Sequence, residues 1–474
     1  MIEIDVAIIG AGSAGLAARR EIAKKSDSYL VFDGGPLGTT CARVGCMPSK
    51  ALIELADKFH SFELGRQFLK KDVTYDVDVN KAMARTRELR DYFTGSVKRG
   101  MESWQSDKFV NEFIEFTGRN TLKAGDKEYR FKKAVIAIGT KPIMPGPWRE
   151  YQSQLHTTDN FFELENIEGS WAVIGLGVIG LELGQALKNL NLEVHAYSRG
   201  KTIAGLSSKT INAYAADYFA KELNANFTGV DVVGREGDKV ILRSGDGIEK
   251  KVDNVLVAIG RSPNFKSLNL EAANVPLDER GVPSYDSKTF RILESDMYLV
   301  GDANMVRPLL HEAADEGRIA GFNAVRAEDQ CFARRTMIGV TFSHPNISTV
   351  GQSKQQIEES GVDFVVGEVS FEDQGRARTQ QKNKGLLEVY AEKKTGVILG
   401  AEIFAPSGEH LAHLLAWAIS MNLDLRKALS LPFYHPVIEE GLRTALRDAL
   451  GKSDQEVKDL EVLRCEEVDP CFNA

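Results

Sequence analysis

Two stretches of the chain share one pattern of apolar and polar positions. Residues 4–33 run from an apolar strand into a glycine-rich turn, then a helix and a second apolar strand. Residues 171–198 repeat the same order. A short apolar run followed by a glycine turn and a helical period predicts the start of a βαβ unit. We therefore expect an α/β chain with two doubly wound, Rossmann-type dinucleotide-binding domains.

The rest of the chain is divided by the same reasoning. Residues 50–105 are predicted to be largely helical, and the stretch that follows is rich in strand patterns. From about residue 335 strands and helices occur without a glycine fingerprint, which predicts an α+β C-terminal domain. The expected boundaries are a first nucleotide-binding domain in 1–150 and 264–334, a second in 151–263, and the C-terminal domain in 335–474.

Composition and charge exclude several classes of protein. The chain has 474 residues, of which 43% are hydrophobic and 27% charged, as in ordinary globular proteins. The net charge of −8 argues against nucleic acid as a partner. No apolar run approaches the roughly 20 residues of a membrane span, so no membrane association is expected. Glu3 and Asp5 interrupt the first apolar run, unlike in a signal peptide, and a cytoplasmic location is expected.

The first glycine turn has the spacing of a dinucleotide site. Gly10, Gly12 and Gly15 fit G-x-G-x-x-G between a strand and a helix. The glycines permit a tight turn and close approach to a pyrophosphate, which would lie on the helix N-terminus. Asp33 ends the second strand, where a carboxylate can accept hydrogen bonds from an adenine ribose.

The second turn, with Gly175, Gly177 and Gly180, repeats this pattern. Ser198 stands where the first unit has its acid, and Arg199 follows it. A serine removes the carboxylate that would repel a 2′-phosphate, and an arginine can bind that phosphate. These residues favour NADP(H) over NAD(H), although a solvated Arg199 without that role is the alternative.

Two similar phrases close the two units. They are Ala134-Val-Ile-Ala-Ile-Gly-Thr140 and Val255-Leu-Val-Ala-Ile-Gly-Arg261. Each reads as a strand that ends in a turn, and we expect Gly139 and Gly260 to lie against a nucleotide.

The cysteines point to redox chemistry. There are five of them, which is too few and too odd a number for a disulfide scaffold. Cys41 and Cys46 are separated by four residues, and Pro48 predicts a helix that begins just after Cys46. A helix N-terminus makes a thiol more reactive, and Arg43 and Lys50 add positive charge. No second Cys/His cluster has zinc spacing, so no metal site is expected.

With these motifs in place, the chain resembles the pyridine nucleotide–disulfide oxidoreductases nearly from end to end. The resemblance implies FAD at the first turn and a nicotinamide nucleotide at the second. Further matching phrases are Val300-Gly-Asp302, Phe342-Ser-His-Pro-Asn-Ile-Ser-Thr-Val-Gly351 and His435-Pro436. The family also implies a homodimer in which each active site uses both chains.

The resemblance assigns a role to each matching residue. It makes Cys46 the thiolate beneath the flavin and Cys41 the thiol that exchanges with substrate. It places Lys50 near the flavin, paired with Glu182, and Asp302 on the ribityl chain of FAD. His435 would be the acid–base residue delivered by the other subunit, oriented by Glu440.

Within the family, Pro48-Ser49-Lys50 and Leu310-His-Glu-Ala-Ala-Asp-Glu-Gly317 are most similar to dihydrolipoamide dehydrogenases. The expected substrate is therefore a small dithiol or disulfide, with a lipoyl-bearing protein as a candidate partner. The alternative is an NADPH-dependent reductase of glutathione disulfide or another small disulfide. Cys465 and Cys471 in the tail are read as ordinary reduced cysteines, since the acidic residues between them would raise their pKa values; an electron relay is the alternative.

Overall fold

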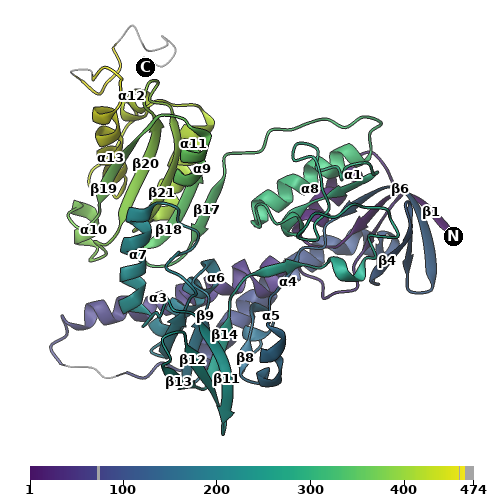
Figure 1. Cartoon of the computed structure of the whole chain (residues 1–474), viewed down its shortest axis with the longest axis horizontal. Coiled ribbons are helices and arrows are strands. Elements are labelled where there is room, and N and C mark those ends of the chain that lie inside the picture. The colour runs from purple at the N-terminus through teal and green to yellow at the C-terminus, as the bar shows by residue number, and fades with distance from the viewer. Residues whose placement is uncertain (72–74, 458–459, 465–474) are drawn as a thin grey trace. The chain divides into compact units, whose positions relative to one another are not determined.

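The computed structural model describes residues 1–71, 75–457 and 460–464. The chain divides into two compact units, each built from two separate segments. The first unit combines Met1–Glu168 with Val257–Arg334, and the second combines Gly169–Leu256 with Arg335–Ala474. Figure 1 labels their elements. None of the helices in the described part of the chain is long and apolar enough to cross a membrane.

The first unit is a mixed sheet with helices packed against it. Its first segment contains β1 (Ile2–Ile9), α1 (Ser13–Ile22), β2 (Tyr29–Phe32), α2 (Thr40–Val44), α3 (Cys46–Arg66), α4 (Val79–Lys108), β3 (Phe109–Val110), β4 (Ile114–Gly118), β5 (Thr121–Ala124), β6 (Lys127–Ile136), β7 (Thr140–Pro142), η1 (Gly146–Tyr151), β8 (Leu155–His156) and α5 (Thr158–Phe161). Its second segment contains β15 (Arg261–Pro263), η2 (Phe265–Ser267), β16 (Met297–Leu299), η3 (Gly301–Asn304) and α8 (Leu310–Ala324).

The sheet of this unit runs in the order β3-β2-β1-β6-β5-β4, and β16 also pairs with β6. β1 is parallel to β2 and β6, as the βαβ pattern predicts. From Val6 to Ile9 the apolar run of β1 is continuous because both faces of the strand are covered there. Val6 and Ile8 join one core with α1 and α8, whereas Ala7 and Ile9 join the core formed with β4 and β5. Both faces of β1 are therefore packed against a core up to the glycine turn that follows the strand.

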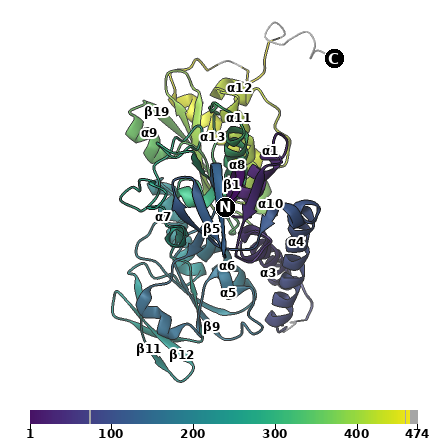
Figure 2. The ribbon, with the colours of Figure 1, turned by 90° about the vertical axis from the view of Figure 1, so that its right-hand side faces the viewer.

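The predicted helical stretch is confirmed as two long helices. α3 and α4 pack against each other and are seen side by side in Figure 2. Asp78 starts α4 by accepting a hydrogen bond from the Lys81 N–H at 2.9 Å. α2 contacts both helices, so the segment that carries the two cysteines rests on a rigid support.

The second unit holds the second glycine turn and the C-terminal sheet. Its first segment contains β9 (Ser170–Ile174), α6 (Val178–Asn189), β10 (Glu193–Tyr197), α7 (Lys209–Glu222), β11 (Val230–Glu236), β12 (Lys239–Ser244), β13 (Glu249–Val252) and β14 (Asn254–Val257). Its second segment contains β17 (Ile338–Thr341), β18 (Asn346–Gly351), α9 (Lys354–Ser360), β19 (Phe364–Ser370), α10 (Gly375–Thr379), β20 (Leu386–Glu392), β21 (Ile398–Ala405), α11 (Gly408–Ser420), α12 (Leu425–Leu429) and α13 (Glu439–Lys452).

The C-terminal sheet of this unit is antiparallel, in the order β17-β18-β21-β20-β19. Successive side chains of a strand point to opposite faces. Leu387 and Val389 belong to the core that α11 and α13 complete. On the other face Phe404 packs against Tyr218 of α7, with ring centroids 5.5 Å apart. The predicted α+β character of this region is confirmed, and Figure 1 shows its helices beside the sheet.

Candidate functional site

The first glycine turn is tight, as its spacing predicts. Gly10, directly after β1, has a φ of +108°, which L side chains rarely adopt. A Cβ on Gly15 would lie 1.9 Å from the carbonyl oxygen of Gly10, so α1 approaches β1 this closely only with glycine there. A Cβ on Gly12 would meet only the Ala137 carbonyl oxygen, at 4.0 Å, and Gly12 caps α1 without a side-chain hydrogen bond. The first turn of α1 is therefore open to a phosphate.

Asp33 lies across this turn from the end of β2. Its Oδ2 accepts a hydrogen bond from the Ala11 N–H at 2.7 Å, and its Oδ1 accepts one from the Gly35 N–H at 2.8 Å. Each carboxylate oxygen keeps a further lone pair, because an ionised carboxylate has about four acceptor sites. The half-buried Asp33 is thus held by the backbone while it can still bind the hydroxyl groups of a ribose.

The two similar phrases of the sequence come together in the first unit. β7 pairs antiparallel with β15, which places Pro263 opposite Thr140. Arg261 donates from Nε to the Thr140 hydroxyl and from Nη2 to the Thr140 carbonyl oxygen, both at 2.8 Å. Gly139 and Gly260 turn the chain at these points with φ of +61° and +121°. The repeated phrase predicted two turns. In the fold, the strands that follow these turns, β7 and β15, pair with each other.

Asp302 lies in η3, directly after β16. Burial raises the pKa of its carboxyl group, and the positive charge of Arg261 opposes this shift. Among the described residues, the hydrogen bond that bears on this carboxyl group comes from the N–H of Asp302 itself. An ionised carboxylate has about four acceptor sites, so this half-buried group keeps room for a hydroxyl group supplied by a bound molecule. Together with the open turn of α1, it supports FAD as the ligand of this unit.

The cysteine pair spans the junction of α2 and α3. Cys41 is half-buried in α2, Cys46 is exposed, and no disulfide joins the two. Cys46 is the first residue of α3, so the predicted helix start is confirmed to within one residue. A Cβ on Gly45 would lie only 3.1 Å from the Cα of Cys41 and 3.0 Å from the Thr40 carbonyl oxygen. The close approach of the two cysteines therefore depends on glycine between the two helices.

Cys41 holds its proton more tightly than an ordinary thiol does. Its hydrogen bond to Cys46 raises the pKa of the Cys41 thiol most, and burial and the charge of Cys46 add to the effect. The positive charge of Lys50 lowers the pKa of Cys41, as expected, but it does not outweigh these causes. At neutral pH Cys41 is therefore a thiol that needs a base before it can exchange.

The second glycine turn has the same local geometry. A Cβ on Gly180 would lie 1.8 Å from the carbonyl oxygen of Gly175, whose φ is +104°. No atom lies within 4 Å of a Cβ built on Gly177, which caps α6 without a side-chain hydrogen bond. Arg199 is exposed, and no ion pair within the described ranges neutralises its guanidinium. The Ser198 N–H donates to the Asn226 carbonyl oxygen at 2.9 Å, which anchors this end of β10.

The remaining predicted residues form local contacts within their units. Glu182 of α6 is 3% exposed, and its Oε1 accepts a hydrogen bond from the Phe342 N–H at 3.0 Å. The exposed His435 places Nδ1 3.0 Å from Glu440 Oε1, and Glu440 Oε2 accepts the Val437 N–H at 3.2 Å. The hydrogen bond to His435 is the main reason that the pKa of Glu440 is lowered. This pair leaves Nε2 of the imidazole facing away from Glu440.

Sequence reasoning missed the residues that surround Asp302. Thr140 binds Arg261, which lies close enough to lower the pKa of Asp302. Glu316 accepts the N–H of Gly301 at 2.7 Å. The partners of each contact are far apart along the chain, and only the repeated Ala-Ile-Gly phrase gave a signal for Thr140. The predicted tail residues Cys465 and Cys471 lie outside the described residues.

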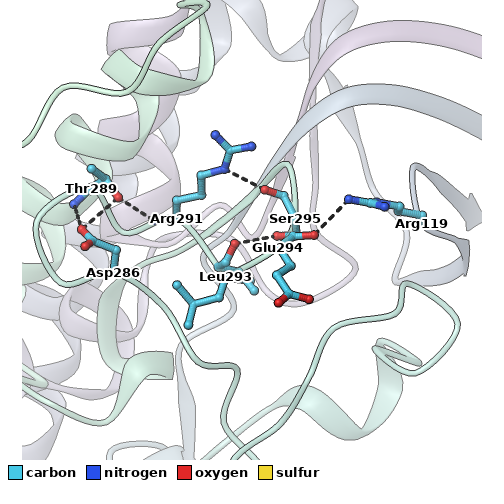
Figure 3. Close-up of a pocket in the computed structure, with 8 residues that line it drawn as sticks. Arg119, Asp286, Thr289, Arg291, Leu293, Glu294 and Ser295 are labelled. Carbon is cyan, nitrogen blue, oxygen red and sulfur yellow. Dashed lines mark hydrogen bonds between the residues drawn. The ribbon is translucent and has the colours of Figure 1, made fainter.

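A pocket of about 560 Å³ opens elsewhere in the first unit (Figure 3). Its lining includes Arg119 and Arg291, but Arg119 donates to the Glu294 carbonyl oxygen at 3.0 Å and Arg291 to the Ser295 carbonyl oxygen at 2.7 Å. Both side chains are thus hydrogen-bonded within the protein, and none of the predicted site residues lines this pocket. We place the candidate site at the glycine turns and the cysteine pair instead.

Comparisons with known proteins agree with this geometry. A family described as pyridine nucleotide-disulphide oxidoreductase matches residues 4–317, and the dimerisation domain of that family matches residues 337–446. A dihydrolipoyl dehydrogenase of Bacillus subtilis is 29% identical over 96% of this chain and 98% of its own length. One of Haloferax volcanii is 28% identical over 95% and 97%.

Solved structures share the fold. The HOCl-induced flavoprotein disulfide reductase RclA of Escherichia coli aligns with a TM-score of 0.77 at 20% identity, covering 94% of this chain and 99% of its own. LpdA of Mycobacterium tuberculosis aligns with a TM-score of 0.80 at 20% identity, with the same coverage.

Proposed function

The chain belongs to the pyridine nucleotide-disulphide oxidoreductase family, and from this premise we propose that it is a dihydrolipoyl dehydrogenase that works through Cys41 and Cys46. As a member of this family it is a flavoprotein disulfide oxidoreductase that uses FAD and a pyridine nucleotide. The observation that carries the proposal is the cysteine pair, held on α2 and α3 in the same unit as the turn that fits FAD. The relatives that share almost the whole length of the chain support dihydrolipoyl groups as the substrate.

The proposed exchange starts from the oxidised Cys41–Cys46 pair. A substrate thiolate attacks the sulfur of Cys41, the bond between the two cysteines breaks, and Cys46 leaves as a thiolate. The second substrate thiol then displaces Cys41, which yields the cyclic substrate disulfide and a reduced pair. FAD held at the first glycine turn and by Asp33 would supply the two-electron acceptor for this reduced pair. The raised pKa of Cys41 agrees with this division of roles, since Cys41 keeps the proton of the reduced pair.

His435 is proposed to manage the proton of this exchange. Glu440 accepts the Nδ1–H of the imidazole, which fixes the tautomer and leaves Nε2 to accept a proton from a thiol. The Val437 N–H holds the other oxygen of Glu440, so the carboxylate itself is fixed. We assign Lys50 to the flavin ring and Glu182 as its partner, on the matching positions of the family.

A homodimer with active sites shared between subunits completes the proposal. The matched dimerisation domain supports it. Leu414 and Trp417 of α11 and Met421, the residue that caps its C-terminus, recur at helical spacing, and 42%, 69% and 72% of their surfaces are exposed in the single chain. An apolar row of this kind is normally covered. A second copy of the chain on this face would deliver its own His435 to the site of its partner.

Arg199 carries the proposed preference for NADP(H). It is exposed beside the second glycine turn with no carboxylate paired to it among the described residues. An unpaired guanidinium there suits a 2′-phosphate. The relatives named dihydrolipoyl dehydrogenase leave this preference open, so it rests on Ser198 and Arg199 alone.

The testing experiment is steady-state oxidation of NADPH and NADH by the purified flavoprotein, with lipoamide or glutathione disulfide as acceptor. Fast turnover with lipoamide that Cys41→Ser and Cys46→Ser each abolish is the expected result. Turnover with glutathione disulfide alone would replace the proposed substrate by the alternative. Cys331→Ser is the matched control, since this exposed cysteine lies outside the pair. Undiminished turnover in both variants of the pair would refute the proposal.

A further inference from the structure

A buried ionic cluster lies behind the turn that carries Asp302. Glu312 and Glu316 of α8 are 4% and 1% exposed. Arg307 donates to Glu312 at 2.9 Å, and Arg334 donates to Glu312 at 2.7 Å and also to Glu316. Two carboxylates thus meet two guanidinium groups, so the cluster is balanced in charge.

Glu316 does more than balance charge. Its Oε2 accepts hydrogen bonds from the Gly301 N–H and from the side-chain amide of Asn304, both at 2.7 Å. These two residues are the first and last of η3, and Asp302 lies between them. A single carboxylate oxygen therefore holds both ends of the turn that presents Asp302.

The same helix also holds the first nucleotide turn. A Cβ on Gly317 would lie 2.1 Å from the carbonyl oxygen of Ala14 in α1, so α8 and α1 are in direct backbone contact. A Cβ on Gly301 would lie 3.1 Å from the Cβ of Ala14. Glu316 precedes Gly317 in α8, so the packing of α8 on α1 also fixes the position of Glu316 beside η3.

Burial disfavours the ionised form of the Glu316 carboxyl group. Desolvation raises the pKa of Glu316 to about 7, even though Arg334 and the N–H of Gly301 favour its ionised form. Glu312 shares Arg334 and is as deeply buried, but it makes no hydrogen bond to η3 among the described residues. Both glutamates thus pair with Arg334, but Glu312 also pairs with Arg307, whereas Glu316 contacts the turn.

We propose that Glu316 is a positioning residue that orients Asp302 toward bound FAD. The proposal rests on the role assigned above to Asp302. Glu316 does not touch the flavin itself; it acts through the backbone of Gly301 and the side chain of Asn304.

The test uses the full-length apoprotein and the dissociation constant of added FAD, measured by the quenching of flavin fluorescence. Glu316→Ala removes two hydrogen bonds to the turn and is expected to weaken FAD binding about 10- to 100-fold. Glu316→Gln keeps an acceptor oxygen and should restore most of this affinity. Glu312→Gln, the matched control, should bind FAD nearly as well as the parent protein. The melting temperature of each apoprotein separates these effects from loss of folding.

A double-mutant cycle decides whether Glu316 acts through Asp302. In the Asp302→Ala background, replacement of Glu316 by Gln or Ala should change FAD affinity no further. Additive losses, or equal affinity of Glu316→Ala and Glu312→Gln, would overturn the inference. If Asp302→Ala alone binds FAD normally, the role proposed for Asp302 fails. If Glu316→Ala does not fold, Asn304→Ala takes its place, because it removes one of the two hydrogen bonds between Glu316 and the turn. The visible circular dichroism of flavin bound to this variant should differ from that of the parent protein. An unchanged spectrum would refute the proposal.

Discussion

Gly177→Ala tests the second nucleotide site without disturbing the fold. Gly177 has φ of −78° and ψ of −173°, a conformation that alanine adopts readily. The added Cβ would have no protein atom within 4 Å. Folding and flavin content should therefore match those of the parent protein.

The cost should appear only when the nucleotide binds. A pyrophosphate on the N-terminus of α6 must approach the backbone at Gly177, and the methyl group would occupy that space. Overpacking by one methyl group costs about 1–3 kcal/mol, which corresponds to a roughly 5- to 150-fold weaker binding. The assay is the rate of flavin reduction as a function of NADPH and NADH concentration, followed by flavin absorbance in a stopped-flow instrument. Reduction at the parent rate and concentration dependence would refute the placement of the nucleotide on this turn.

Gly180→Ala is the matched control. Its Cβ would lie 1.8 Å from the Gly175 carbonyl oxygen, whereas ordinary contacts begin at 3.4 Å, so α6 would have to move by about 1.6 Å. This variant should lose thermal stability in the second unit as well as nucleotide binding. The contrast separates a residue that makes room for the ligand from one that makes room for the helix.

Three further variants test the remaining assignments. His435→Gln should lower turnover with lipoamide by about 100-fold or more while NAD(P)H still reduces the flavin at the parent rate, and a simultaneous loss of both would contradict a role confined to thiol protons. Burial raises the pKa of Glu316 from 4.5 to about 7, so the folded protein holds a proton there that the unfolded chain releases, and the free energy of unfolding falls as pH rises from 4.5 through 7. At about 1.36 kcal/mol per pKa unit this loss of stability is about 3 kcal/mol. Denaturation curves at pH 5 and pH 8 measure it, and Glu316→Gln should abolish this difference in the free energy of unfolding. If the variant kept the same difference between pH 5 and pH 8 as the parent protein, the assignment would be wrong. Trp417→Glu should convert a dimer into monomers in sedimentation velocity, whereas exposed Tyr92→Glu in the first unit should not.

The local features of this protein follow from short stretches of sequence. A glycine turn between an apolar strand and a helix needs only neighbouring residues, because Gly15 must pass the carbonyl of Gly10 wherever the fold places them. The start of α3 next to Cys46 and the two glycine turns were predicted for the same reason. The role of Arg199, two residues after the end of β10, stays a prediction from the sequence.

Tertiary structure decided what surrounds these local features. Burial and the hydrogen bond to Cys46 raise the pKa of Cys41, whereas the positive charges near it in the sequence predicted a lowered pKa. Asp302 was assigned from a motif, but the effect of the Arg261 charge on its pKa depends on the folded chain, in which β15 pairs with β7. No repeating pattern of the sequence predicts the hydrogen bond from the Gly301 N–H to Glu316. Hydrogen bonds and desolvation depend on distances in space, and those distances exist only after the strands have paired and the helices have packed.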